Sequence, residues 1–498
     1  MKYGNMRRFL TSFPVAACLF AAVAGPRIAI AARPRHPSSA RSAAAAAACP
    51  TSIERPPRTS PAEPERADPR AGEELTPAWE HRPRDGTLLR FDGVVDPAGN
   101  VYWIEVPRDS RGGELVSASR DGEVRYRAPL SGSGLTLAGD LLVTGLSASG
   151  CRGLAAPSIE AHRARDGALA WRRELLPAIA GWMRVPGSCR YGGAHAVAVN
   201  GNAVVVAASI LDADTKEHES GFLALDAATG EVAWAIRTSA DGNVAESGSP
   251  RVAEDGRIYA SRRVTAQKEP LLVLQGPAPR ELGPAGATPH RDVLAAAGAL
   301  LFVEGAAGPD PTVASRATVE VRCRATGEPL GALDAAGAVP LAAAGAVWLF
   351  GDALSRHDVA TGALSWRVRL GAAPPGSARG RTAMILRTDP VVTRAGAVLF
   401  AEQPGLLRQA IATFEPGAAL LREIDAAGRE TLRRTLPGGA EAYSGAAALD
   451  RGRWFVAAVP YHAAEGGVLR AFDVGARAPA PHGWIAPAGS MARDNRAR

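Results

Sequence analysis

Five side chains in the segment LDADTKEHES could ligate a cation: Asp212, Asp214, Glu217, His218 and Glu219. Oxygen ligands at alternate positions are typical of Ca²⁺ sites, but the central glycine and terminal glutamate of an EF-hand loop are missing here. The segment also falls where a polar loop between two strands is expected. We therefore interpret it as a solvated loop and name no metal ligand in this chain.

The sequence lacks the motifs of nucleophilic, haem and phosphate chemistry. It contains no G-x-S-x-G nucleophile elbow and no C-x-x-C-H haem attachment motif, and its nine histidines form no H-x-x-x-H pair. The glycines of Tyr191-Gly192-Gly193 lack the strand and helix that a phosphate-binding loop needs. We therefore predict no catalytic residue and no cofactor-binding residue.

The positive charge of the chain comes almost entirely from arginine. The net charge is +7, yet the only lysines are Lys2, Lys216 and Lys268. The arginines are scattered among acidic residues, without the basic helix or stripe that binds nucleic acid. Together with abundant alanine, glycine and proline, this composition is typical of GC-rich coding, and we predict no nucleic-acid partner.

A repeated pattern provides the elements that must position any functional residue. The segment 221–238 reads GFLALDAATGEVAWAIRT, and the segment 354–370 reads LSRHDVATGALSWRVRL. In each, two alternating strands flank a turn that contains glycine, and weaker copies lie at 115–130, 159–175, 318–334 and 419–436. The turn glycines are Gly122, Gly167, Gly230, Gly327, Gly362 and Gly428, with Gly276 in a degenerate copy; the aromatic residues four positions later are Tyr126, Trp171, Trp234 and Trp366.

Each type of residue that recurs in the pattern has a physical role. Glycine in the turn adopts a positive φ without steric cost. Asp226 and Asp358, four residues before Gly230 and Gly362, can accept hydrogen bonds from backbone N–H groups of the turn. Tryptophan suits the gap between neighbouring sheets, where its apolar ring is buried and its N–H meets a backbone carbonyl.

Short strands, glycine-rich turns and a period of roughly 40–60 residues predict a β-propeller of four-stranded antiparallel blades. Eight apolar strands that each follow a turn favour eight blades, and seven is the alternative. The last blade shows only three strands near the C-terminus. The segment LTPAWE, with Trp79 in the tryptophan position, lies alone before the first complete blade. We predict that this N-terminal strand completes the last blade and removes the exposed sheet edges.

The five cysteines suggest one disulfide. Cys151 falls in a loop between the second and third strands of its blade, and Cys189 falls in the link to the next blade. Loops of these two types emerge on the same face, and an exported protein meets oxidising conditions. We predict a Cys151–Cys189 disulfide, with two free thiols as the alternative. Cys323 alternates with Val319 and Val321, and we interpret it as a buried thiol.

The N-terminus has the form of an export signal. Residues 1–8 are basic, and an apolar stretch of about 17 residues follows, which is short for a membrane span. Val15-Ala16-Ala17-Cys18 resembles a lipobox, which would place a lipid on Cys18, whereas ordinary secretion is the alternative. We predict a signal peptide at 1–32, a disordered Pro/Ala/Arg-rich tether at 33–74 that includes Cys49, the propeller at 75–475, and a tail at 476–498.

The segment ALDAATGEVAW, residues 224–234, resembles the repeat of the PQQ-like, quinoprotein-type β-propellers. This group includes quinoprotein alcohol dehydrogenases and the non-enzymatic scaffold lipoprotein of the outer-membrane β-barrel assembly machinery. The resemblance covers about 75–475; it is strong at 226–234 and 358–366, moderate at 159–171 and weak elsewhere. The tail from Trp484 resembles a segment that often flanks such propellers.

The resemblance leaves two kinds of function open. Dehydrogenases of the group hold a quinone and Ca²⁺ in the central funnel, and many have a disulfide between adjacent cysteines. This sequence has no Cys-Cys pair and no long catalytic insertions. We therefore expect a monomeric, non-catalytic scaffold without a cofactor, exported to the periplasm, the outer membrane or the outside, with an unidentified envelope protein or small ligand as partner. A PQQ-dependent dehydrogenase and a carbohydrate or small-ligand binder are the alternatives.

Overall fold

The computed structural model describes Cys49 and most of residues 72–480. The residues outside the description are 1–48, 50–71, 108–111, 147, 150–157, 183–189, 201, 213–217, 239–244, 248–249, 253–256, 261, 265–270, 275–279, 283–289, 298, 306–317, 335–338, 344–345, 372–380, 409–412, 439–440, 460–465 and 481–498. They include Cys18, Cys151, Cys189, Gly276 and Trp484, so the lipid on Cys18 and the Cys151–Cys189 bond stay predictions. The middle of the acidic segment, with Asp214 and Glu217, lies outside as well.

The described strands form eight antiparallel sheets of four or more strands, which are the blades of a β-propeller. Blade 1 consists of β2 (Thr87–Val95), β3 (Val101–Pro107), β4 (Gly113–Ala118) and β5 (Val124–Leu130). Blade 2 consists of β6 (Ser133–Ala138), β7 (Leu141–Leu146), β9 (Ser158–Arg163) and β10 (Leu169–Glu174). Blade 3 consists of β11 (Arg190–Asn200), β12 (Ala203–Asp212), β13 (His218–Asp226) and β14 (Val232–Arg237), with β8 (Ala148–Ser149) beside β11.

The next three blades follow the same order. Blade 4 consists of β16 (Arg251–Val252), β17 (Ile258–Ala260), β19 (Leu271–Leu274) and β20 (Arg280–Leu282). Blade 5 consists of β21 (His290–Ala297), β22 (Leu300–Gly305), β23 (Thr318–Cys323) and β24 (Pro329–Asp334). Blade 6 consists of β25 (Val339–Ala343), β26 (Ala346–Phe350), β27 (Ala353–Asp358) and β28 (Leu364–Arg369).

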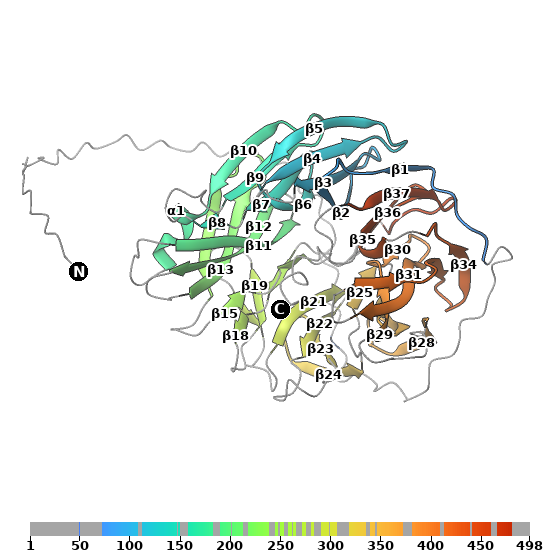
Figure 1. Ribbon diagram of the computed structural model, residues 1–498. Helices are drawn as coiled ribbons and strands as arrows, with labels where there is room; N and C mark the ends of the chain where they lie inside the picture. Colours follow the sequence, from blue (N-terminus) through green and yellow to red (C-terminus); the bar gives the residue numbers. More distant parts are fainter. Residues whose placement is uncertain are drawn as a thin grey trace, which may run out of the picture. The chain divides into compact units, whose positions relative to one another are not determined.

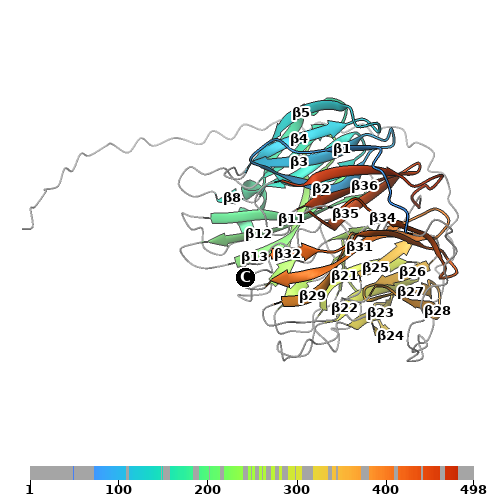
Figure 2. The ribbon, with the colours of Figure 1, turned by 45° about the vertical axis from the view of Figure 1, so that its right-hand side comes forward.

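The last two blades differ from this plan. Blade 7 consists of β29 (Arg381–Arg387), β31 (Val398–Arg408), β33 (Leu420–Ile424) and β34 (Glu430–Thr435), and both β30 (Val391–Val392) and β32 (Thr413–Pro416) pair with β31. Blade 8 consists of β35 (Ala442–Asp450), β36 (Arg453–Val459), β37 (Val468–Asp473) and β1 (Trp79–His81). The all-β propeller of four-stranded blades predicted from the sequence is confirmed, and the blades succeed one another in chain order (Figures 1 and 2).

Three short elements lie outside the four-stranded plan. Strand β15 (Ala245–Ser247) pairs only with β18 (Arg262–Val264) among the described residues, as a two-stranded sheet. Helix α1 (Leu176–Ile179) and the 3₁₀ helix η1 (Ala180–Trp182) follow β10. Their side chains Ile179 and Trp182 join the hydrophobic cluster between blades 2 and 3. Within the part of the chain that the structure describes, no helix has the length and apolarity to cross a membrane.

Blades 1, 2, 3, 6, 7 and 8 pack against a neighbour on both faces, which explains why their middle strands read as almost continuous apolar runs. In strand β7, neighbouring residues pack on opposite faces of the blade: Leu142 packs into a cluster with blade 1, and Val143 packs into a cluster with blade 3. Further clusters join blades 3 and 4, 5 and 6, 6 and 7, 7 and 8, and 8 and 1. Successive strand residues point to opposite faces, so a run such as AVWLF in β26 supplies two neighbouring joints at once.

The N-terminal strand β1 forms the edge of blade 8. It pairs antiparallel with β37 through Trp79↔Ala471, Glu80↔Arg470 and His81↔Leu469 (Figure 1). Backbone pairing also continues beyond the limits predicted for the propeller: Glu74 bridges Thr435, and Pro479 bridges Thr393. Segments before residue 75 and after residue 475 are therefore attached to blade 7. That β1 holds the ring closed remains a prediction.

Candidate functional site

The repeat residues form a tightly hydrogen-bonded turn. Asp226 Oδ1 accepts hydrogen bonds from the backbone N–H groups of Ala228 and Thr229 and from the Thr229 hydroxyl, at 2.9–3.1 Å. Gly230 has φ of 68° and donates its N–H to the carbonyl of Asp226. Asp358, Thr361 and Gly362 repeat this arrangement in blade 6. Hydrogen bonds from Thr361 lower the pKa of the Asp358 carboxyl, so the charged form stabilises the turn.

The aromatic residue of one blade packs on the turn glycine of the next. Nε1 of Trp171 donates to the carbonyl of Ala227 at 2.9 Å, and a Cβ on Gly230 would lie 2.5 Å from Trp171 Cε3. Trp366 reaches the carbonyl of Ala426 beside Gly428, Trp79 reaches the carbonyl of Arg120 beside Gly122, and the hydroxyl of Tyr126 reaches the carbonyl of Ala164 near Gly167. Trp234 packs with Ile258, Ala260 and Leu274 of blade 4. We call these contacts the aromatic joints.

We expect Gly230→Ala to destabilise the protein by about 2–5 kcal/mol. The substitution places an L-residue at φ of 68°, which costs about 1–2 kcal/mol. It also forces a methyl group against the Trp171 ring, which costs about 1–3 kcal/mol. Gly139→Ala is the matched control, because Gly139 has φ of 64° with no atom within 4 Å of its Cβ position. Equal losses for the two variants in urea unfolding would contradict the aromatic joint.

A second polar position recurs five residues before the turn glycine. His162 Nδ1 lies 3.0 Å from the carbonyl of Gly167, His357 Nδ1 lies 3.1 Å from that of Gly362, and Arg322 donates to that of Gly327. All three side chains are buried. We did not predict this position from the sequence. The signal was present, since IEAHRARDG and LSRHDVATG place histidine at the same distance from glycine.

Ser355 and His357 have the geometry of a nucleophile and a base. Ser355 Oγ lies 3.1 Å from His357 Nε2, and the Gly362 carbonyl orients the other ring nitrogen. However, Ser355 is 6% exposed and His357 is 2% exposed. Both side chains lie on a central strand of blade 6, where they connect the strand to its turn. The arrangement therefore fits a structural hydrogen-bond chain better than a reaction centre.

Burial lowers the pKa of His357, against the opposing hydrogen bond with Gly362, so the folded protein holds this ring neutral. In the unfolded chain the ring takes up a proton as the pH falls through about 6.5. We therefore expect the free energy of unfolding to fall as the pH drops below that value, by at most about 1.4 kcal/mol per pH unit from this group. His357→Gln is expected to remove this part of the pH dependence between pH 7 and 5 in urea titrations. Ser355→Ala, which keeps the ring, is expected to retain it.

The closing seam, defined as β1 with the blade 1 residues that it contacts, contains a buried carboxylate. Glu105 accepts hydrogen bonds from Arg127 at 2.9 and 3.1 Å and from Trp103 Nε1 at 3.3 Å. His81 Nε2 on β1 lies 2.8 Å from Glu105 Oε1. Burial disfavours the charge on Glu105, but the hydrogen bonds from His81 and Arg127 outweigh it and lower the pKa to about 2. This carboxylate therefore stays charged and fastens the edge strand of blade 8 to blade 1.

A larger buried charge network lies in blade 7. Arg422 pairs with Glu402 at 2.8 Å and with Glu430 on the neighbouring strand, and all three side chains are buried. Glu402 also accepts the backbone N–H of Gly371, which belongs to the link from blade 6. Burial opposes the charge of Arg422, yet the two carboxylates raise its pKa above the ordinary value. The network therefore holds the strands of one blade together and anchors the chain that enters it.

One carboxylate of the acidic segment at 212–219 takes part in an ion pair and is not free to ligate a cation. Glu219 is buried and forms a two-pronged ion pair with Arg237, at 2.8 Å for each contact. Among the described residues, no group of three His, Cys, Asp or Glu side chains could hold a metal ion. Within the described residues, a Ca²⁺ ion would thus find no cluster of three carboxylate ligands.

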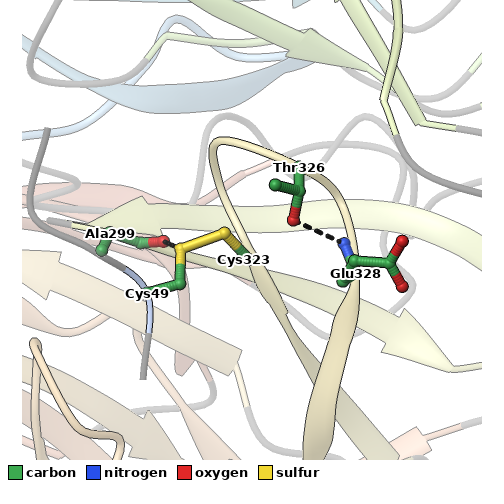
Figure 3. The surroundings of a disulfide bond; sticks show 5 residues. All are labelled: Cys49, Ala299, Cys323, Thr326 and Glu328. Atoms are coloured by element: carbon green, nitrogen blue, oxygen red, sulfur yellow. Dashed lines mark hydrogen bonds between the residues drawn. A yellow bond between two sulfur atoms is a disulfide. The ribbon is translucent and has the colours of Figure 1, made fainter. Parts of the chain in front are cut away.

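The structure corrects the interpretation of Cys323 as a thiol. Cys323 is buried, as predicted, but it forms a disulfide with Cys49, 274 residues away in the chain (Figure 3). Cys49 lies in the segment interpreted as a disordered tether. The pairing was missed because alternation along β23 reports that Cys323 points inward, but not that a distant segment meets it there.

Comparisons with known proteins concern the fold. The sequence matches no family model and no curated protein. Among solved structures, BamB from Moraxella catarrhalis is similar, with 14% identity and a TM-score of 0.43 over 80% of this chain and 97% of that one. The chain is a β-propeller.

Two quinohemoprotein alcohol dehydrogenases are similar to a comparable degree. ADHIIG from Pseudomonas putida HK5 has 12% identity and a TM-score of 0.41, over 84% of this chain and 80% of that one. The enzyme from Comamonas testosteroni has 12% identity and a TM-score of 0.39, over 84% and 79%. At these identities and TM-scores the similarities carry no argument about activity, so the functional proposal rests on the residues.

Proposed function

We propose that this protein is an exported, non-catalytic scaffold, a rigid β-propeller that presents its loops to a protein or small ligand of the cell envelope. One observation carries the proposal: the buried charged and imidazole groups of the described residues are used to fasten strands and blades. These groups are Glu105, Glu160, His162, Glu219, Arg322, His357, Glu402, Arg422, Glu423, Glu430 and Arg470. Each has a hydrogen-bond or ion-pair partner within the protein.

Buried polar groups that are paired in this way stabilise the fold and are poorly suited to proton transfer in catalysis. A general acid or base must be able to gain or lose a proton near the operating pH. Glu105 has a pKa of about 2, and His357 is held neutral by burial. Breaking a buried pair to free one partner is strongly unfavourable. Groups committed in this way are poor catalysts, but they fix the relative positions of neighbouring strands, which is what a binding scaffold requires.

A backbone feature supports a role in protein binding. The segment Gly72–Leu75 lies along the edge of β34 and exchanges backbone hydrogen bonds with it: Leu75 N–H to the Thr435 carbonyl at 2.8 Å and Thr435 N–H to the Glu73 carbonyl at 2.9 Å. The edge of β34 therefore binds an extended segment of its own chain through backbone hydrogen bonds. Strand addition of this kind is also a common mode of peptide recognition.

The test is a titration of the purified protein with PQQ and Ca²⁺, followed by the quinone absorbance, and then an assay of dye reduction with alcohols and sugars. We expect neither stoichiometric binding nor turnover. Stoichiometric binding with turnover would overturn the scaffold proposal in favour of the dehydrogenase. Saturable binding of a sugar or other small molecule without turnover would favour the alternative in which the central funnel binds a ligand.

The scaffold proposal also predicts a partner whose binding depends on the intact ring. The protein is cross-linked in envelope fractions, beside a variant in which residues 76–81 are replaced by glycine and serine. A partner retained by the wild-type chain and lost from the variant supports the proposal. Equal retention by both would show that the cross-linked species does not recognise the propeller.

A further inference from the structure

The N-terminal segment is attached to the propeller at three described places. Cys49 forms the disulfide with Cys323 at the end of β23 in blade 5. Gly72–Leu75 pairs with the edge of β34 in blade 7, where the Thr435 hydroxyl also donates to the Gly72 carbonyl. Trp79–His81 forms the edge strand of blade 8. Only the first of these attachments is covalent, and only the first depends on the redox environment.

The disulfide lies against the turns of blade 5. Cys323 is paired with Leu300 in the strand ladder, and its N–H donates to the carbonyl of Glu328 across the turn. Cys49 Sγ lies 3.4 Å from the carbonyl oxygen of Ala299, which precedes β22 (Figure 3). Cys323 is 4% exposed, whereas Cys49 is only partly buried. Cys323 is therefore held in place by the strands of blade 5, whereas Cys49 belongs to the N-terminal segment that the bond attaches to this blade.

We propose that the Cys49–Cys323 disulfide is a redox-controlled clasp that keeps the closing strand β1 on blade 8. Strand β1 pairs over only three residues, and a strand so short detaches readily when one of its ends is free. With the bond formed, the chain around β1 is fixed on both sides, at Cys49 on blade 5 and at β2 in blade 1. A detached β1 then has far less conformational freedom, so detachment is less favourable.

The chemistry of the clasp is a thiol–disulfide exchange. During formation the two thiols lose two protons and two electrons, and a disulfide-bearing oxidant of the exported compartment accepts them and becomes a dithiol. In the reverse direction an external thiolate attacks the sulfur of Cys49, the less buried of the two residues, and the Cys323 thiolate leaves; a second thiolate of the reductant then attacks the mixed disulfide and releases the Cys49 thiolate. The stability of the closed ring thereby increases only after the chain reaches an oxidising environment.

The experiment is hydrogen exchange followed by mass spectrometry on the full chain, oxidised and then reduced with dithiothreitol. We expect reduction to speed exchange of the peptides that contain Gly72–Leu75 and Trp79–His81 by at least tenfold. A peptide from Ala346–Phe350 in β26 is the internal reference, and its exchange is expected to speed up far less than that of the two N-terminal segments, because it reports only the loss of global stability. Because a predicted Cys151–Cys189 bond would also be reduced, the variant Cys49→Ser is measured without reductant.

The outcomes decide the proposal. If Cys49→Ser, and the double variant Cys49→Ser with Cys323→Ala, show the fast exchange at both segments without reductant, the clasp is supported. If exchange at Trp79–His81 is the same in the oxidised, reduced and variant proteins, the disulfide does not keep β1 on blade 8 and the proposal is wrong, even if the bond itself is present. Alkylation of Cys49 and Cys323 in the unreduced protein would also overturn it. None of these readouts depends on whether the protein is an enzyme or a scaffold.

Discussion

Replacing residues 76–81 with a glycine–serine segment of equal length is expected to unfold the propeller, or to lower its melting temperature by more than about 10 °C. Strand β1 supplies the fourth strand of blade 8, and its removal leaves the edge of β37 without a partner. Trp79 also packs with the cluster that joins blades 8 and 1. The loss therefore weakens one blade and one joint together, and if β1 closes the ring, as we predict, it also destabilises the other blades.

The individual contacts of β1 indicate the size of the effect. Truncating a fully buried aromatic side chain costs about 3–5 kcal/mol. Trp79 is partly buried, so the packing loss is smaller, but the hydrogen bond that it donates to the Arg120 carbonyl at 2.8 Å is lost as well. His81 contributes the contact with the buried Glu105 carboxylate. Trp79→Ala alone should therefore give a large part of the loss, whereas Arg82→Ala, which removes an exposed ion pair with Glu441, should change stability by less than about 0.5 kcal/mol.

Thermal unfolding measured by circular dichroism distinguishes ring closure from a passive edge strand. If β1 only covers an edge, the replaced variant loses little more stability than Trp79→Ala, and the other blades unfold as in the wild-type protein. If β1 closes the ring, unfolding of the variant begins earlier and near-ultraviolet signals from tryptophans of distant blades change with it. An unchanged melting temperature would contradict the prediction.

Local patterns were sufficient to predict the fold because a propeller repeats one local unit. The spacing of turn glycines and aromatic residues reflects contacts between neighbouring hairpins, so Gly230 and Trp171 could be assigned structural roles from sequence. Blade 4 shows where such signals weaken. Its strands are two to four residues long, and its predicted turn glycine, Gly276, lies outside the described residues.

Contacts between distant segments could not be predicted in this way. The partner of Cys323 depends on where the chain around Cys49 runs, and no periodicity encodes that path. Arg477 is a second case: it follows the last strand and forms a two-pronged ion pair with Glu423 of blade 7. Buried charges such as Arg422 were missed because an alternating strand with a charged residue reads as half-exposed, whereas here both faces of the sheet are covered.

Arg422→Met is expected to destabilise the protein by about 3–5 kcal/mol, because it leaves two buried carboxylates without their main partner. Arg422 bridges Glu402 and Glu430, and its side chain is as inaccessible as theirs. Methionine fills a similar volume, so the loss reports the uncompensated charges more than a cavity. Arg163→Met is the matched control, since Arg163 pairs with Asp166 at the surface and both side chains are about 40% exposed.

Neutralising the carboxylates separates charge from packing. If the cost of Arg422→Met comes from buried charge, adding Glu402→Gln and Glu430→Gln should recover a large part of it, because an uncharged amide is much cheaper to bury than a carboxylate. Recovery in urea unfolding at pH 7 would show that the network is electrostatically coupled. A loss for Arg422→Met no larger than that for Arg163→Met, or no recovery in the triple variant, would contradict this account, because blade 7 would then be held by its apolar contacts alone.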